Sequence, residues 1–292
     1  MKNFIPRIIG RLKREKQKLV KKLRFLKPTI KKDKLKKDLL NVGIQPGDTI
    51  LVHSSLSKTG NVEGGASTVI AALIETVTEK GNVAMPSYSY VHSMIQTTKE
   101  ADYVFIPDTT PSVVGFITET FRKWKNIKRS IHPTHSVCVH GAGAEFITSG
   151  HLEAETNFGL NTPFHRMREL KGKMVGIGVT TSIIPLYHSI EDFYPEEFPG
   201  VYIPQSFPVK VMVNNEVVEK KIFVHDPAFH ADRIDKNSKI ESWFRNHFRQ
   251  QGLLYEGTFG DGEIWWMDMQ SLFAELLTLK KKGISIYNIP TS

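Results

Sequence analysis

Along residues 47–292 the apolar positions follow two periods in turn, one typical of buried strands and one typical of amphipathic helices. Short apolar runs bounded by turn residues predict strands at 49–53, 82–90, 135–141 and 172–179. Apolar residues three and four positions apart predict helices at 63–81, 109–124, 185–195 and 269–283. Strands that alternate with helices predict a layered α/β domain, in which helices flank a central, mostly parallel or mixed sheet.

Two segments add detail to this prediction. In 207–224, two runs of period two flank Asn214 and Asn215, a pair typical of tight hairpin turns, so we expect a β-hairpin insertion there. In 109–124, Pro111 is expected in the first turn of the helix, where its missing N–H costs nothing.

Composition narrows the class of protein. No apolar run approaches the roughly 20 residues that a membrane-spanning helix needs. The single cysteine, Cys138, excludes an internal disulfide, and its apolar neighbours favour a place in the core over a nucleophilic role. We therefore predict a cytoplasmic protein.

Charge is distributed unevenly along the chain. Residues 1–37 hold 16 of the 39 basic residues and 2 of the 30 acidic ones, so this segment carries +14 and the rest of the chain −5. Apolar residues recur every seven positions from Ile5 to Leu26, which predicts a basic amphipathic helix. A solvated or disordered arm and a peripheral anchor on anionic lipid at the inner membrane face both fit. Nucleic acid binding is disfavoured, because no aromatic stacking platform accompanies the charges.

Several common sites are excluded by spacing. The glycine pairs at 141–146 and 176–181 lack the third glycine of a dinucleotide site, and no phosphate-binding P-loop is present. A serine nucleophile elbow is also absent. His132 and His135 are three residues apart, but Pro133 between them argues against a helical ligand pair, so we predict no metal.

Two stretches of the chain beyond residue 37 each have two possible functions that spacing does not distinguish. The stretch HSSLSKTGNVEGGAST places hydroxyls and glycines at a helix start, which suits an anion but is equally typical of an ordinary strand–loop–helix turn. His188 and Glu191 are three residues apart in a predicted helix, so they share a face. They are either a surface pair or a general base with the carboxylate that orients it.

Six motifs in order resemble the aminoglycoside 3-N-acetyltransferase family, the antibiotic N-acetyltransferases, from about residue 46 to 280. They are HSSLS with GG, MPSYSY, the PDTTPSVVGFITETFR run, RSIHPTHSVCVHGAGAEFI, FGLNTPFHRMRELKGKMVGIGV, and HSIE. The resemblance implies a domain over 38–292 that transfers an acyl group directly from acetyl-CoA, or another acyl-CoA, to an amine of a sugar-like acceptor.

The resemblance also implies roles for particular residues. His188 and Glu191 would be the catalytic base and its partner. The residues expected near CoA are His53, Ser54, Ser55, Gly64, Gly65 and Ser87, and those expected beside the acceptor are Arg129, His132 and Asp192.

The acceptor stays open between an aminoglycoside antibiotic, as for resistance enzymes, and an amino sugar of surface-polysaccharide assembly. The basic tail and residues 196–240 depart from the family pattern. A non-catalytic CoA- or glycan-binding relative is the alternative from another class. The orientation of His188 and Glu191 relative to the CoA cleft discriminates it from an enzyme.

Overall fold

The structure is a computed structural model of the chain and describes residues 28–229 and 233–290. The amphipathic pattern and the membrane contact expected of the basic tail rest on residues outside this part. Within the described ranges, no helix is both long enough and apolar enough to cross a membrane.

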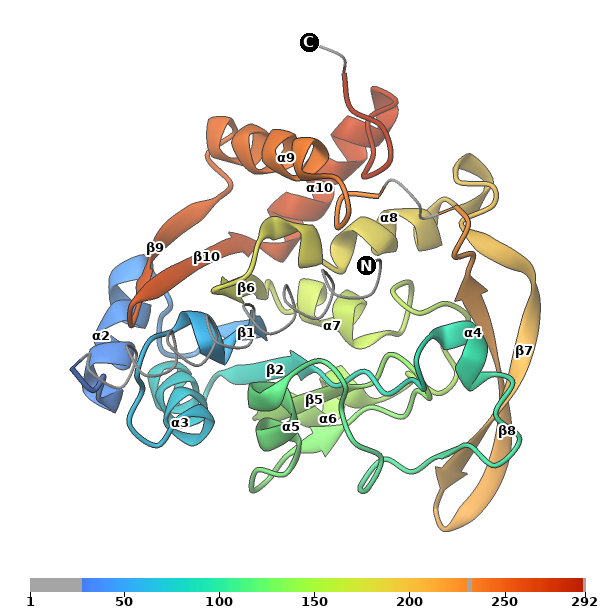
Figure 1. The fold of residues 1–292 in the computed structure, drawn as a ribbon, viewed down its shortest axis with the longest axis horizontal. Coiled ribbons are helices and arrows are strands. Elements are labelled where there is room, and N and C mark those ends of the chain that lie inside the picture. The colour runs from blue at the N-terminus through green and yellow to red at the C-terminus, as the bar shows by residue number, and fades with distance from the viewer. Residues whose placement is uncertain (1–27, 230–232, 291–292) are drawn as a thin grey trace, which may run out of the picture.

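A mixed sheet lies at the centre of the described fold, with strands in the order β4-β5-β2-β1-β6-β10-β9 (Figure 1). Strands β2, β1 and β6 are parallel, and the others run antiparallel to their neighbours. The bounds are β1 (Thr49–Ser54), β2 (Asn82–Pro86), β4 (Lys128–Arg129), β5 (Val137–Gly141), β6 (Lys173–Ile177), β9 (Tyr255–Phe259) and β10 (Gly262–Asp268). The predicted α/β fold with a mixed sheet is confirmed.

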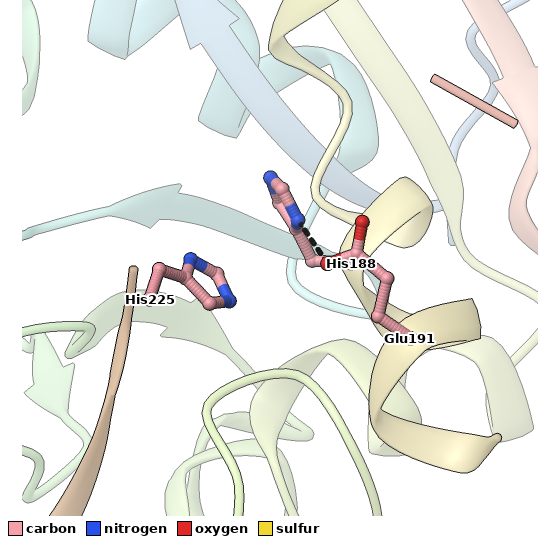
Figure 2. Close-up of side chains that lie close together, drawn as sticks. All are labelled: His188, Glu191 and His225. Carbon is pink, nitrogen blue, oxygen red and sulfur yellow. Dashed lines mark hydrogen bonds and ion pairs between the residues drawn. The ribbon is translucent and has the colours of Figure 1, made fainter. Parts of the chain in front are cut away.

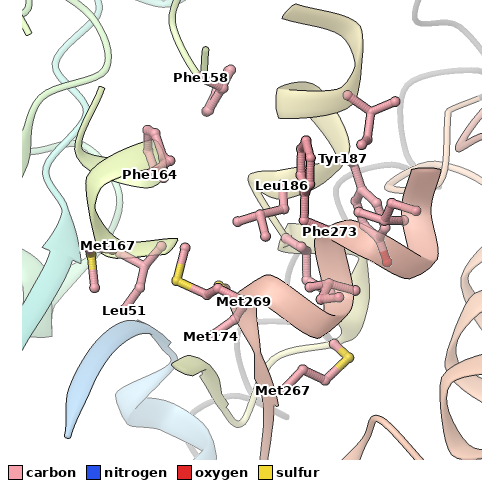
Figure 3. Close-up of a cluster of buried hydrophobic side chains, with 14 of the residues drawn as sticks. Leu51, Phe158, Phe164, Met167, Met174, Leu186, Tyr187, Met267, Met269 and Phe273 are labelled. Atoms are coloured by element: carbon pink, nitrogen blue, oxygen red, sulfur yellow. The ribbon is translucent and has the colours of Figure 1, made fainter. Parts of the chain in front are cut away.

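Helices cover both faces of the sheet, because successive strand side chains point to opposite sides. Ile50 and Val52 pack toward α2 (Lys32–Val42), α3 (Ala66–Val77) and α5 (Phe116–Arg122). Leu51 points to the other face. The helices there are α6 (Ala144–Thr148), α7 (Pro163–Glu169), α8 (Leu186–Phe193), α9 (Ser238–Gln250) and α10 (Met269–Lys281). Figure 3 shows this second core, which includes Phe164, Leu186 and Phe273.

Helix α2 belongs to the folded body, so the boundary predicted between residues 37 and 38 is misplaced. It falls inside the helix, whose Leu35 and Leu39 are fully buried against α3 and β9. Ile30, before the helix, is also buried and bridges to Val62. The apolar face of 31–44 can be removed from water only by packing on the sheet domain.

Helix α5 is shorter than predicted, and Pro111 lies outside it. The helix begins after Gly115, whose φ of 140° a residue with a Cβ rarely adopts. The Ser112 N–H donates to Glu119 Oε2 at 2.8 Å, so residues before the helix form a loop that is tied back to its first turn.

A second sheet of β3 (Val104–Phe105), β7 (Tyr202–Val213) and β8 (Glu216–His225) stands beside the main one (Figure 1). The predicted hairpin is confirmed: Asn214 and Asn215 join β7 to β8 with φ of 50° and 68°, as a type I′ turn requires. The short helix α4 (Met94–Thr97) packs on β8. Strand β8 ends at His225, which it brings to the functional site.

Candidate active site

A cavity of about 680 Å³ lies where the parallel strands β1, β2 and β6 end. His53 lies near the end of β1, Tyr88 and Tyr90 follow β2, and the chain after β6 turns through η2 (Thr181–Ile183) into α8. The carboxyl ends of parallel strands are where open α/β sheets bind their ligands. Residues at the end of β8 and before α9 close the opposite wall.

Helix α8 carries His188 to this cavity. The helix follows Pro185, whose fixed φ suits a helix start, and it ends at Phe193, before Pro195. Its Leu186 and Ile190 are buried in the core, which anchors the helix. His188 remains partly exposed, and its ring lines the cavity.

His188 and Glu191 are hydrogen-bonded to each other, as Figure 2 shows. His188 Nδ1 lies 2.8 Å from Glu191 Oε2, and the Tyr287 hydroxyl donates to the other carboxylate oxygen, also at 2.8 Å. The Glu191 side chain is only 2% exposed. Because the carboxylate accepts the hydrogen bond of Nδ1–H, the other ring nitrogen, Nε2, is the one that carries the lone pair.

Two further residues approach this pair from distant segments. Arg233, before α9, places Nη1 at 3.5 Å from His188 Nε2. His225, at the end of β8, has its ring centroid 4.9 Å from that of His188 and 4.5 Å from that of Tyr202. No sequence motif pointed to Tyr287, Arg233 or His225, since each lies far along the chain from the HSIE motif.

One group in the described part of the chain has the composition of a metal site. Ligand atoms of His188, Glu191 and His225 lie within 4.8 Å of one another (Figure 2). Two histidines and a carboxylate are a set that binds Zn²⁺. An ion there would replace the proton shared by His188 and Glu191, so metal binding and base catalysis would compete for the same atoms.

The residues predicted near CoA divide into two groups. His53 lines the cavity, and burial lowers its pKa to about 3, so its ring is neutral at neutral pH. Ser54 and Ser55 follow it, and Gly64 and Gly65 precede α3 with φ of 69° and 60°. These four residues do not line the cavity.

Three further residues predicted to contact ligands are buried or partly buried beside the site. Ser87 is fully buried, and its carbonyl accepts hydrogen bonds from Ser136 Oγ and from Arg129 Nη2. Arg129 also donates hydrogen bonds to Ser136 Oγ and to the backbone carbonyls of residues 107 and 110. His132 is 1% exposed and stacks on His151 at 4.6 Å. None of these three residues is among the described residues that line the cavity, and their contacts with ligands stay predictions.

Asp192 is also not among the described residues that line the cavity. Its carboxylate accepts the Phe158 N–H at 2.7 Å and the Tyr202 hydroxyl, and burial raises its pKa to about 6. Phe158 in turn packs 5.2 Å from the His188 ring, measured between centroids. Asp192 thus ties α8 to the wall of the site, and its contact with an acceptor stays a prediction.

The fold and the site together define a layered α/β protein with a histidine–carboxylate pair in a cavity at the ends of its parallel strands, and the comparisons give the family. The family model described as aminoglycoside 3-N-acetyltransferase matches residues 51–279. Aminoglycoside N(3)-acetyltransferase III of Acinetobacter baumannii is 32% identical over 256 residues, which cover 82% of this chain and 88% of that protein. The chain belongs to the aminoglycoside 3-N-acetyltransferase family.

Other matches are shorter or more distant. The SPbeta prophage-derived aminoglycoside N(3′)-acetyltransferase-like protein YokD of Bacillus subtilis strain 168 is 31% identical over 175 residues, 55% of this chain and 64% of that protein. Matches to the first three curated relatives span 64%, 60% and 51% of those proteins' lengths. The solved structure of AAC-IIIb, a binary complex with CoASH, has a TM-score of 0.75 over 91% of this chain and 100% of that chain at 21% identity, a likeness of fold.

Proposed function

We propose that the protein is a CoA-dependent N-acyltransferase that moves an acetyl group from acetyl-CoA to an amine of an amino sugar, with His188 as the general base. The observation that carries this proposal is the orientation of the pair: Nδ1 of His188 is held by the buried Glu191, and the ring lines the cavity. An amine attacks a thioester only once its nitrogen lone pair is available, so a base at this place is what the reaction needs.

The proposed transfer is direct. The nitrogen–carbon bond forms while His188 Nε2 takes a proton from the amine. The carbon–sulfur bond then breaks, and the imidazolium returns that proton to the leaving thiolate sulfur. Glu191 stabilises the imidazolium between these events, and Tyr287 holds the carboxylate in place.

His53 is the residue best suited to the thioester oxygen. Because burial lowers its pKa to about 3, it is neutral and has one ring N–H to donate. Its Nε2 is buried and has no hydrogen-bond partner among the described residues. A neutral histidine donor stabilises the negative charge that develops on that oxygen. The proposed CoA contacts also include four residues at the end of β1 and before α3, namely Ser54, Ser55, Gly64 and Gly65.

The names of the relatives favour an amino-sugar acceptor, since those proteins are aminoglycoside N(3)-acetyltransferases. A non-catalytic CoA- or glycan-binding protein is the alternative. It is disfavoured because binding alone does not require a histidine base that is oriented by a buried carboxylate. The cytoplasmic location and the contact of the basic tail with anionic lipid stay predictions from sequence. Vesicle sedimentation of the full chain and of a chain without residues 1–27 tests the lipid contact.

The deciding experiment is a screen for CoA thiol release from acetyl-CoA in the presence of aminoglycosides and nucleotide-linked amino sugars. The enzyme should release thiol with at least one acceptor, and His188→Ala should abolish release while acetyl-CoA still binds in calorimetry. Thiol release that persists in His188→Ala contradicts the proposed base. Binding of acetyl-CoA without turnover of any acceptor favours the non-catalytic relative.

A further inference from the structure

His135 is a buried histidine that lines the cavity and has no role in the proposed transfer. It lies just before β5, in a segment that is fixed to the chain after β2, because the Ser87 N–H donates to the Ser136 carbonyl at 2.7 Å. The ring of His135 packs on those of Tyr88 and Phe158, with centroid distances of 4.7 and 5.0 Å. Backbone pairing and ring packing together hold this imidazole in one place.

The hydrogen bonds around Thr134 decide which ring nitrogen of His135 carries the proton. Nδ1 of His132 accepts the backbone N–H groups of Thr134 and His135 at 3.3 and 3.0 Å, so its lone pair is already used. The buried Thr134 hydroxyl lies 3.0 Å from His135 Nδ1 and 3.5 Å from His132 Nδ1. A buried hydroxyl needs an acceptor for its proton, and His135 Nδ1 is the better placed of the two. His135 therefore carries its own proton on Nε2.

The Nε2–H of His135 is accessible from the cavity. Among the described residues Nε2 has no hydrogen-bond partner, and it is not one of the fully buried side-chain atoms that lack a partner. The ring lines the cavity, so this is the side from which Nε2 is reached. Burial lowers the pKa of His135 to about 3, so the imidazole is neutral at neutral pH. The cavity therefore contains a fixed, neutral hydrogen-bond donor.

Phe158 lies next to both this donor and the proposed base. Its ring centroid is 5.0 Å from that of His135 and 5.2 Å from that of His188, and the two imidazoles make no ring contact with each other. They are two separate polar contact points on the wall of one cavity. A sugar ring carries its amine and its hydroxyls on different carbons, so one ring can present the amine to His188 and a hydroxyl to His135.

We infer that His135 is a specificity-determining residue for the acceptor, and that its Nε2–H donates a hydrogen bond to a hydroxyl oxygen on the ring that carries the amine. The inference rests on the proposed function, because it concerns the acceptor of the same site. When that hydroxyl is missing, the buried donor is left without a partner, so the site should reject the deoxy sugar. The same hydrogen bond orients the ring so that its amine lies at His188.

The test compares a hydroxylated acceptor with its deoxy analogues in the thiol-release assay. The acceptor that reacts fastest is supplied together with analogues that each lack one ring hydroxyl. With the wild type, we expect one analogue to have a kcat/KM at least tenfold below that of the parent. His135→Phe keeps a ring against Tyr88 and Phe158 but has no donor. It should lower kcat/KM for the parent at least tenfold and leave that of this analogue within about threefold.

Two further variants assign the effect to the donor. His135→Gln has an N–H donor near the place of Nε2 and should restore part of the ratio between parent and analogue. His151→Asn is the matched control. His151 is also fully buried, is not among the described residues that line the cavity, and bonds Ser130 through Nδ1, the atom that an asparagine side chain can replace. The ratio in His151→Asn should equal that of the wild type, and thermal unfolding checks that each variant is folded.

The donor itself can be observed in the wild-type protein. NMR of the imidazole nitrogens distinguishes the two neutral tautomers from the imidazolium, and the signals of His135 are those that are absent in His135→Gln. Between about pH 5 and pH 8 we expect a proton on Nε2 and none on Nδ1. A proton on Nδ1 in this range contradicts the inference, because the nitrogen that faces the cavity then has no proton to donate or belongs to a cation.

The outcomes separate this inference from the proposed function. Equal kcat/KM for the parent and every deoxy analogue overturns the inference and leaves the proposed acyl transfer intact. A loss in His135→Phe by the same factor for the parent and all analogues also overturns it, because a residue that only supports the fold or contacts the thioester has this effect. If no acceptor releases thiol, the proposed function fails, and the inference fails with it.

Discussion

Glu191→Gln tests whether the buried carboxylate works through its charge or only through its shape. Glutamine has nearly the same size, and its amide oxygen can still accept the hydrogen bond from His188 Nδ1, so the base keeps its tautomer. The variant loses the negative charge next to the imidazolium that forms during transfer. Two unit charges about 4 Å apart interact by about 4 kcal/mol at an effective dielectric constant of 20. Since 1.36 kcal/mol is tenfold in rate, we expect kcat to fall about 10²–10³-fold.

Tyr287→Phe is the matched comparison for this prediction. It removes the hydrogen bond to the other Glu191 oxygen, 2.8 Å long, but leaves the charge. That hydrogen bond exists before and during the reaction, so we expect less than a tenfold loss of kcat.

The assay is thiol release at saturating acetyl-CoA and acceptor, with thermal unfolding to check that each variant is folded. A Glu191→Gln enzyme with kcat within tenfold of the wild type, or no slower than Tyr287→Phe, refutes the electrostatic reasoning. A change confined to KM would refute it as well.

Three further predictions follow from burial and geometry. Burial lowers the pKa of His132, His135 and His151 in the folded state. Below about pH 6.5 these histidines take up protons in the unfolded chain but stay neutral in the folded protein, so the free energy of unfolding falls as the pH falls. Each should remove about 2 kcal/mol at pH 5, which urea unfolding at pH 7.5 and pH 5 measures, and equal stability at the two pH values contradicts this. Leu35→Ala should cost about 2–5 kcal/mol by urea unfolding, whereas a loss below about 1 kcal/mol would place α2 outside the core. Zn²⁺ should inhibit acyl transfer reversibly with EDTA, and inhibition of equal strength in His225→Phe would exclude the three-residue group as its site.

Local patterns predicted those parts of the fold whose signal lies within one element. Apolar runs located β1, β2, β5 and β6, and the two asparagines located the turn between β7 and β8. Helix α9 was not predicted, because its buried Ile240, Phe244 and Phe248 form a narrow stripe in an otherwise charged segment. The side chain of Asn237, which accepts hydrogen bonds from the first N–H groups of α9, was a signal that could have located its start.

In the site, too, the sequence predicted only the contact that lies within one helix. The spacing of His188 and Glu191 predicted that they share a helix face, and they do. Proximity to a motif did not indicate that Arg129 bonds the Ser87 carbonyl or that His132 stacks on His151. A sequence gives no indication of which polar side chains are buried with one another.

By itself the sequence determined the α/β class, the hairpin, the family and the pairing of His188 with Glu191, because each of these depends on neighbouring residues or on an ordered series of motifs. Only the tertiary structure decided that Tyr287, His225 and Arg233 meet at His188, from segments between 37 and 99 positions away in the chain. It also decided that Asp235 is the acidic residue that lines the cavity within 28–229 and 233–290, although acids outnumber bases beyond residue 37. The reason is physical: composition fixes the total charge, whereas packing fixes which charges face a substrate.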